Sequence, residues 1–232
     1  MSYANGPRIV TDGLVLHLDA ANRKSYPGSG STWYDLSGNG NNGTFGPSTA
    51  APTFSSSNGG SIVFDGVNDY INCGSNNSLD IQGNSITLGV WLKASSITSN
   101  GHVIAKNSYA NGYIIHYDTA YEGLSGGGFQ TANVNNVPFE WGENILINNW
   151  YYIAYTYDGS LEKGYYNANL VNSKSSSANI SSNSSNDLYI GNNSSANDAW
   201  HGNISQVSIY NKALNNSEIR QNFEATKGRF GL

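Results

Sequence analysis

The feature that most constrains this chain is a series of short segments in which apolar and polar residues alternate. In residues 13–20, GLVLHLDA, the side chains of Leu14, Leu16 and Leu18 fall on one face of an extended backbone. This spacing is the period-2 pattern of a half-buried strand. Comparable runs, bounded by Gly, Asn or Ser, occupy residues 61–64, 69–73, 85–94, 102–106, 112–118, 150–157, 187–191 and 202–211. We therefore expect an all-β fold.

The stretches between these runs predict one hairpin and several loops. Asp158 and Gly159 form a favoured turn pair after the alternating run that ends at Tyr157. Residues 172–186 are so rich in Ser and Asn that they predict a long solvated loop or a hairpin tip. Residues 122–149 mix a triple glycine with a Pro-containing aromatic patch, which predicts broken strands and an exposed loop.

One short helix is predicted near the end of the sequence, at residues 214–225. Asn215 suits the N-cap position, and Glu218 stands three residues later, as a capping box requires. Leu214 can pack against Ile219, and Phe223 follows Ile219 one turn later on the same face. We expect no other helix of comparable length.

Composition and charge narrow the class of protein. The 232 residues suit a single β domain. The net charge is −5 and Lys and Arg are scattered, so no basic stripe faces a phosphate backbone and we expect no nucleic-acid partner. No apolar run reaches the roughly 18 residues of a membrane span or resembles a signal peptide, so we expect no membrane association. Cys73 is the only cysteine, which excludes an intrachain disulfide and indicates synthesis in a reducing cytoplasm.

The order of the segments resembles that of a known family. The pieces GLVLHLDA, VFDGVNDYI, ITLGVWLK, WYYIAYTYDG, LYIG and GNISQVSIYNKALNNSEI follow one another as in the laminin G-like, or concanavalin A-like, jelly roll of the lectin/glucanase superfamily. The resemblance extends over roughly residues 12–225. It implies a sandwich of two antiparallel sheets with one short C-terminal helix. Residues 1–11 are then an N-terminal arm and residues 226–232 a C-terminal tail.

The two flanks carry a narrower resemblance. Residues 7–44, PRIVTDGLVLHLDAANRKSYPGSGSTWYDLSGNGNNGT, and the ending FEATKGRFGL look like jelly-roll proteins of tailed phages, notably those of marine cyanobacteria. This resemblance implies a non-enzymatic structural protein of the virion, a homo-oligomeric capsid decoration or a tail appendage that contacts other virion proteins. Both ends are then expected to dock on a partner, so that deleting either leaves the fold intact. The alternative is a carbohydrate-binding lectin or adhesin domain for host-surface glycans.

Candidate catalytic residues do not form a recognisable set. Glucanases of this superfamily place carboxylates on one strand in a pattern like Glu-x-Asp-x-x-Glu, which this sequence lacks. Glu140 and Glu143 are the nearest pair, but their spacing of three puts them on opposite faces of a strand. The four histidines show neither a nucleophile motif nor zinc spacing. We expect no catalytic residues, and we take Trp141, Glu140 and Glu143 as candidate ligand-binding residues because Trp141 can stack on a sugar.

Two carboxylates lie four residues apart in the stretch FDGVNDY, at Asp65 and Asp69. The favoured interpretation is a tight turn whose side chains bond to its own backbone. The alternative is a calcium site, since Asp65, Asn68 and Asp69 offer some of the six to eight oxygens that Ca²⁺ takes. Relatives often carry a motif like Gly-x-Ile-Asp-Glu near the last strand, where this chain has Ser205 and Gln206. That departure favours the turn, and we expect no other cofactor.

Overall fold

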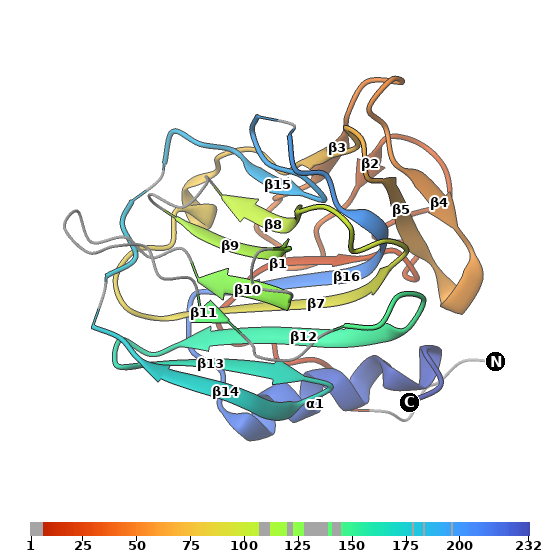
Figure 1. The fold of residues 1–232 in the computed structure, drawn as a ribbon. Helices are drawn as coiled ribbons and strands as arrows, with labels where there is room; N and C mark the ends of the chain where they lie inside the picture. The colour runs from red at the N-terminus through yellow and green to blue at the C-terminus, as the bar shows by residue number, and fades with distance from the viewer. Residues whose placement is uncertain are drawn as a thin grey trace.

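The computed structural model describes residues 7–106, 112–119, 123–127, 139–140, 145–177, 179–182, 184–195 and 197–232. Two antiparallel sheets lie face to face, and one α-helix packs on the outside of one of them; Figure 1 shows this arrangement. The expected concanavalin A-like sandwich is confirmed. No helix among the described residues is long and apolar enough to cross a membrane.

Sheet A holds the longest strands. Its members are β1 Leu14–Asp19, β4 Thr53–Ser55, β5 Ser61–Asp65, β7 Ile86–Ala94, β12 Trp150–Tyr157, β13 Leu161–Tyr166, β14 Asn169–Ser175 and β16 His201–Tyr210. They follow the order β14-β13-β12-β7-β16-β5-β4, and β1 also pairs with β16. The last strand in the sequence therefore lies in the middle of the sheet.

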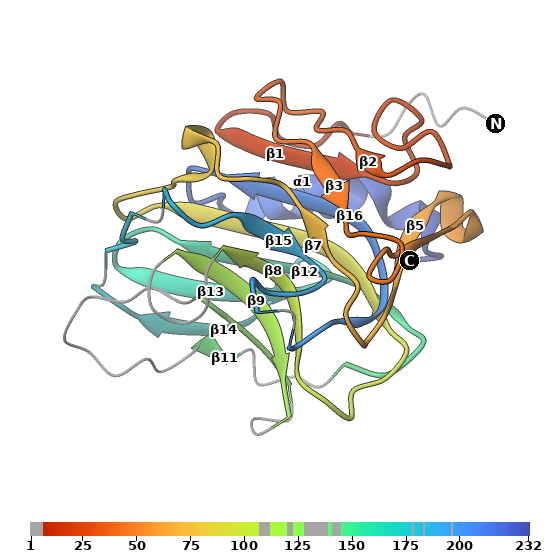
Figure 2. The ribbon, with the colours of Figure 1, turned by 90° about the horizontal axis from the view of Figure 1, so that it is seen from above.

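Sheet B is built from shorter strands. Its members are β2 Thr32–Trp33, β3 Gly43–Phe45, β6 Ile71–Asn72, β8 Gly101–Lys106, β9 Tyr113–Asp118, β10 Gly123–Gly127, β11 Phe139–Glu140 and β15 Leu188–Ile190. The order is β11-β10-β9-β8-β15-β6-β3-β2. Figure 2 shows this sheet layered over sheet A. Three short 3₁₀ helices, η1 Ser57–Gly59, η2 Asn77–Leu79 and η3 Lys227–Arg229, complete the described elements.

The core fills the space between the sheets. The alternation in residues 13–20 predicts the buried positions of Leu16 and Leu18 but is wrong for Leu14, because a β-bulge between Leu14 and Leu16 turns Leu14 to the outer face of the sheet, where it packs beside α1. Leu16 and Leu18 of β1 are fully buried there, and so are Ile104 of β8 and Ile190 of β15. Each such side chain contributes roughly 1.5–3 kcal/mol when removed from water. Alternate residues of the same strands point to the outer faces, which are where ligands and the helix can bind.

The helix begins where the capping box predicts. Helix α1 Asn216–Thr226 has Asn215 as its N-cap, whose side chain accepts from the backbone N–H of Ser217 and Glu218. The Glu218 carboxylate accepts in return from the N–H of Asn215 at 2.8 Å. The cap therefore satisfies donors that would otherwise lack partners at the helix N-terminus.

A second apolar cluster forms between α1 and the outer face of sheet A. Trp91, Tyr152 and Tyr210 are buried on the sheet side, and Ile219 is buried on the helix side. The indole N–H of Trp91 donates to the hydroxyl of Thr226 at 2.8 Å. The helix thus covers the aromatic residues that alternate outward from β7, β12 and β16.

The described parts of both terminal segments also pack on this domain. The N–H of Val10 donates to the Asn222 side chain at 2.8 Å, and the Tyr210 hydroxyl donates to the Val10 carbonyl at 3.0 Å. Near the other end, Arg229 forms a two-bond ion pair with Asp19, at 2.7 and 2.8 Å. These contacts hold the described parts of both segments against the domain itself, which argues against the expectation that a partner alone holds them. The bounds 1–11 for an N-terminal arm and 226–232 for a C-terminal tail remain a prediction.

One expectation about the loops is corrected. The Ser- and Asn-rich composition predicts a loop from residue 172, but β14 continues to Ser175 and pairs with β13. A second tight turn makes this possible, because Asn167 and Ala168 adopt φ angles of 49° and 64°, as a two-residue hairpin turn requires. The hairpin predicted around Asp158 is confirmed by the pairing of β12 with β13.

Candidate functional site

The outer face of sheet B carries polar and aromatic side chains that alternate with core residues. Tyr189 lies between the buried residues Leu188 and Ile190, and Asn72 follows the buried Ile71. Tyr189 and Asn72 are directly opposite each other in the pairing of β15 with β6. This part of the face therefore brings together residues more than a hundred positions apart in sequence.

A cleft of about 440 Å³ opens beside this pair. We call it the Tyr70 cleft; it is lined by Asn42, Thr44, Phe45, Tyr70, Asn72, Cys73, Gly74 and Asp187. The ring of Tyr70 meets that of Tyr189 edge-on, with 5.8 Å between the ring centroids. The half-buried Tyr70 thus presents an aromatic wall that its neighbour holds in place.

Hydrogen bonds fix the polar side chains of the Tyr70 cleft. The amide nitrogen of Asn72 donates to the Asp187 carboxylate at 2.8 Å, and its amide oxygen accepts from the N–H of Gly74 at 2.7 Å. Asp187 and Asn72 are half-buried and Thr44 is exposed, so their remaining donor and acceptor capacity faces the cleft. The Cys73 thiol is buried and burial raises its pKa, so it is not a reactive thiolate.

Two histidines stack on the same outer face, between strands β8 and β9. The rings of His102 and His116 have centroids 5.5 Å apart. Burial, with a smaller contribution from the neighbouring His116, lowers the pKa of His102 to about 4. Burial also lowers the pKa of His116, against the opposing effect of Asp118. Both rings are therefore neutral at pH 7.

The Asp65–Asp69 stretch forms a turn between β5 and β6 whose carboxylates bond to the turn's own backbone. The Asp69 carboxylate accepts from the N–H of Asp65 at 2.9 Å, and the Asp65 carboxylate accepts from the N–H of Val67 at 2.8 Å. Burial raises the pKa of Asp69, and the nearby charge of Asp65 adds to the increase. Asn68, the third candidate ligand, lies between them in the turn, and the calcium alternative remains a prediction.

We expect removal of calcium by EDTA to change the melting temperature by no more than about 2 °C. The carboxylates of Asp65 and Asp69 already bond to the backbone of the turn, and a ligand stabilises a protein only as far as it binds the folded state more tightly than the unfolded state. Thermal unfolding followed by circular dichroism, with and without added CaCl₂, measures this. A melting temperature that falls by about 5 °C or more in EDTA, and no longer does so in Asp65→Asn, would instead make the turn a calcium site.

The structure separates Glu140 from the Tyr70 cleft. Glu140 belongs to β11 at the far end of sheet B, opposite Ser125 in register. Trp141 and Glu143 lie outside the described residues. The cleft residues Tyr70, Asn72 and Asp187 were not predicted, although alternation around Ile71 does place Tyr70 and Asn72 on an outer face.

Comparison with known proteins assigns the chain to a family. Residues 65–220 match the model of the concanavalin A-like lectin/glucanases superfamily. The match covers more than half of the chain, which belongs to this superfamily. A search of curated protein sequences finds no match.

Solved structures show the same fold. One of them is domain 4 of AbnA, a GH43 extracellular arabinanase from Geobacillus stearothermophilus, in complex with arabinotriose. Its TM-score is 0.67 at 18% sequence identity, and the match covers 91% of this chain and 98% of that one. The binding domain of botulinum neurotoxin serotype G has a TM-score of 0.67 at 16% identity, covering 90% of this chain and 50% of that one. Trypanosoma rangeli sialidase with the inhibitor DANA has a TM-score of 0.64 at 14% identity, covering 97% of this chain and 36% of that one. The chain thus spans about half of the neurotoxin domain and about a third of the sialidase.

Proposed function

We propose that this protein is a non-catalytic carbohydrate-binding domain and that the Tyr70 cleft is its sugar site. The observation that carries the proposal is an aromatic ring beside a fixed amide and carboxylate on the outer face of a lectin-type sandwich. The complex of arabinotriose with the similar arabinanase domain supports glycan binding by this fold.

The chemistry of the Tyr70 cleft suits a sugar ring. The apolar face of a pyranose or furanose packs on an aromatic ring, and its hydroxyls need both donors and acceptors. Tyr70 supplies the ring, the Asp187 carboxylate accepts, and the Thr44 hydroxyl does both. Because hydrogen bonds already hold Asn72 and Asp187, little side-chain freedom is lost on binding.

Two features support the absence of catalysis. The sequence lacks the Glu-x-Asp-x-x-Glu pattern of glucanases. In the Tyr70 cleft, Asp187 is the one carboxylate among the described lining residues, whereas glycoside hydrolysis ordinarily uses a pair. We therefore propose binding without turnover.

Replacing Tyr70 with Ala is expected to weaken glycan binding at least tenfold, because the stacking surface is lost. A glycan array on the purified domain identifies the ligand, and titration calorimetry then measures Kd for the wild type, Tyr70→Ala and Asp187→Asn. Tyr34→Ala serves as the matched control, since Tyr34 is 47% exposed and does not line the cleft.

The same measurements also test the ligand-binding residues predicted from the sequence, Trp141, Glu140 and Glu143. Binding that survives Tyr70→Ala but is lost in Trp141→Ala, Glu140→Gln or Glu143→Gln would move the sugar site to residues 140–143. A wild-type protein that binds no glycan on the array would contradict the proposal.

A structural role in a phage particle, as capsid decoration or tail appendage, is a separate proposal supported only by the flanking sequences 7–44 and 223–232. A virion adhesin would combine this role with glycan binding. Mass spectrometry of purified particles, with copy-number estimation, tests it: many copies per particle would support the role, and absence from particles would refute it.

A further inference from the structure

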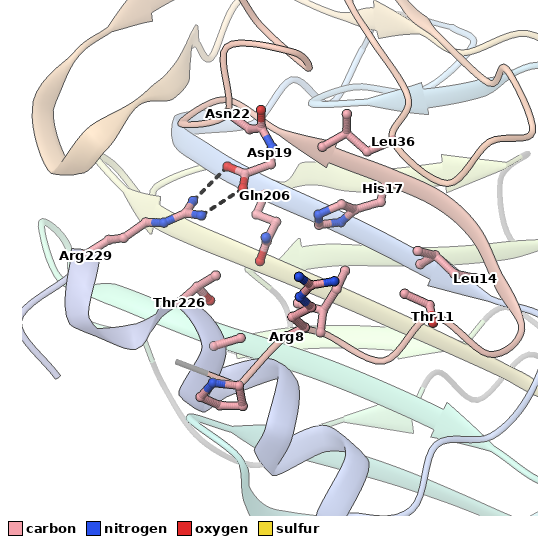
Figure 3. A pocket seen from close by; sticks show the side chains of 13 residues that line it. Arg8, Thr11, Leu14, His17, Asp19, Asn22, Leu36, Gln206, Thr226 and Arg229 are labelled. Carbon is pink, nitrogen blue, oxygen red and sulfur yellow. Dashed lines mark hydrogen bonds and ion pairs between the residues drawn. The ribbon is translucent and has the colours of Figure 1, made fainter. Parts of the chain in front are cut away.

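A second cavity, of about 530 Å³, lies on the side of the molecule formed by sheet A and α1, away from the Tyr70 cleft on sheet B. Its walls come from the N-terminal residues 7–11, from β1 and β16 of sheet A, and from the end of α1 with η3. Figure 3 shows Arg8, His17 and Gln206 directed toward the same space. The volume lies within the range of about 300–1,000 Å³ typical of small-molecule sites. We call it the Arg8 cavity.

Gln206 is the side chain in this cavity whose amide is left available to a ligand. The residue is only 4% exposed, and its side-chain amide forms no hydrogen bond to any residue that the structure describes. A β-bulge in the pairing of β16 with β7 lies between Ile204 and Gln206, and such bulges re-aim side chains. The amide is not among the fully buried side-chain groups that lack a partner, so it reaches the open space of the cavity, and a ligand can form hydrogen bonds with it in place of water.

The charges in the walls leave one unbalanced cation. Asp19 is occupied by Arg229 through two hydrogen bonds. Arg8 is exposed, and its guanidinium is in no ion pair with a described residue. His17 shares a hydrogen bond with Ser208 at 3.0 Å through Nδ1, and burial lowers its pKa, so it adds no charge at pH 7. The Arg8 cavity therefore carries a single net positive charge.

We propose that the Arg8 cavity binds a small polyhydroxylated monocarboxylate. The planar guanidinium of Arg8 matches a carboxylate through two parallel hydrogen bonds. Gln206 offers both a donor and an acceptor to hydroxyl groups, and Leu14 and Leu36 line the space available to the carbon chain. A dianion is disfavoured, because its second charge would face the Asp19 carboxylate without a further cation.

Titration calorimetry with D-gluconate tests the proposal. D-sorbitol is the matched neutral probe, because it has the same carbon chain with a CH₂OH group in place of the carboxylate. We expect the wild type to bind gluconate saturably and to bind sorbitol and inorganic phosphate at least tenfold more weakly. Arg8→Ala and Gln206→Leu are each expected to weaken gluconate binding at least tenfold, with melting temperatures that show both variants to be folded.

Two control variants test whether gluconate binding depends on the Arg8 cavity itself. Arg23→Ala removes one exposed positive charge outside the cavity and is expected to leave gluconate binding unchanged. Tyr70→Ala removes the proposed sugar site on sheet B and is also expected to leave it unchanged, so either proposal can fail alone. The inference is overturned if the wild type does not bind gluconate, if sorbitol binds equally well, or if folded Arg8→Ala and Gln206→Leu bind as the wild type does.

Discussion

Deletion of residues 227–232 is expected to lower the free energy of unfolding by about 3–5 kcal/mol and the melting temperature by about 10 °C. The deleted segment contains Phe230, whose ring stacks on Trp91 with 4.1 Å between centroids. It also contains Arg229, the partner of Asp19, which is only 4% exposed. The deletion therefore exposes a buried indole and leaves a buried carboxylate without its cation. Urea unfolding followed by tryptophan fluorescence measures the loss.

A shorter deletion provides the control. Gly231 and Leu232 are exposed, so removal of these two residues alone is expected to cost less than about 0.5 kcal/mol. Phe230→Ala and Arg229→Gln divide the effect between the aromatic stack and the ion pair. A urea midpoint that is the same for the six-residue deletion and the wild type would show that the tail does not stabilise the domain.

Substitution of Gly191 by Ala is expected to destabilise the fold by about 3–5 kcal/mol, since two costs combine. Gly191 has φ +80°, a backbone conformation that costs an L-residue roughly 1–2 kcal/mol. A Cβ atom at this position would also overlap the ring of Phe64, which is fully buried in the core. Because the core is close-packed, the ring cannot move without disturbing the packing between the sheets.

A second glycine separates the two costs. Gly40 has nearly the same backbone angle, φ +74°, but a Cβ there would have no atom within 4 Å. Gly40→Ala is therefore expected to cost only the backbone part, about 1 kcal/mol. Equal losses of stability in the two variants, measured by urea unfolding, would show that Phe64 moves aside without cost.

Much of the fold could be predicted from the sequence because its signals are local. Alternation in GLVLHLDA gives the inward face of β1 from Leu16 to Leu18, although the bulge before Leu16 reverses Leu14, and the pairing of Asn215 with Glu218 gives the start of α1. The end of the Ser-rich strand β14 could not be read in the same way. The residues of β14 are mostly exposed, and none is buried on either face. The sequence of β14 therefore shows no alternation of apolar and polar residues, and its pairing with β13 depends on the tight turn at Asn167 and Ala168.

The candidate site was less predictable because its residues are brought together by pairing between distant strands. Asn72 and Asp187 form one hydrogen bond although 115 residues separate them. No pattern in the sequence indicates that β6 and β15 are neighbours in sheet B. The same holds for Arg8 and Gln206, which line one cavity only because the N-terminal segment packs against α1. The aspartates at 65 and 69, in contrast, interact within one turn and could be interpreted locally.

The central place of β16 in sheet A has a consequence for biosynthesis. This strand pairs with β7 on one side and β5 on the other, and β1 also pairs with it. Residues 201–210 leave the ribosome after all other described strands. Until then the edges of β1, β5 and β7 that pair with β16 lack their partner and can pair with other chains. Sheet A can close only when β16 has been made, so its folding is expected to begin late in the synthesis of this domain and to be slow, as in other proteins dominated by long-range contacts.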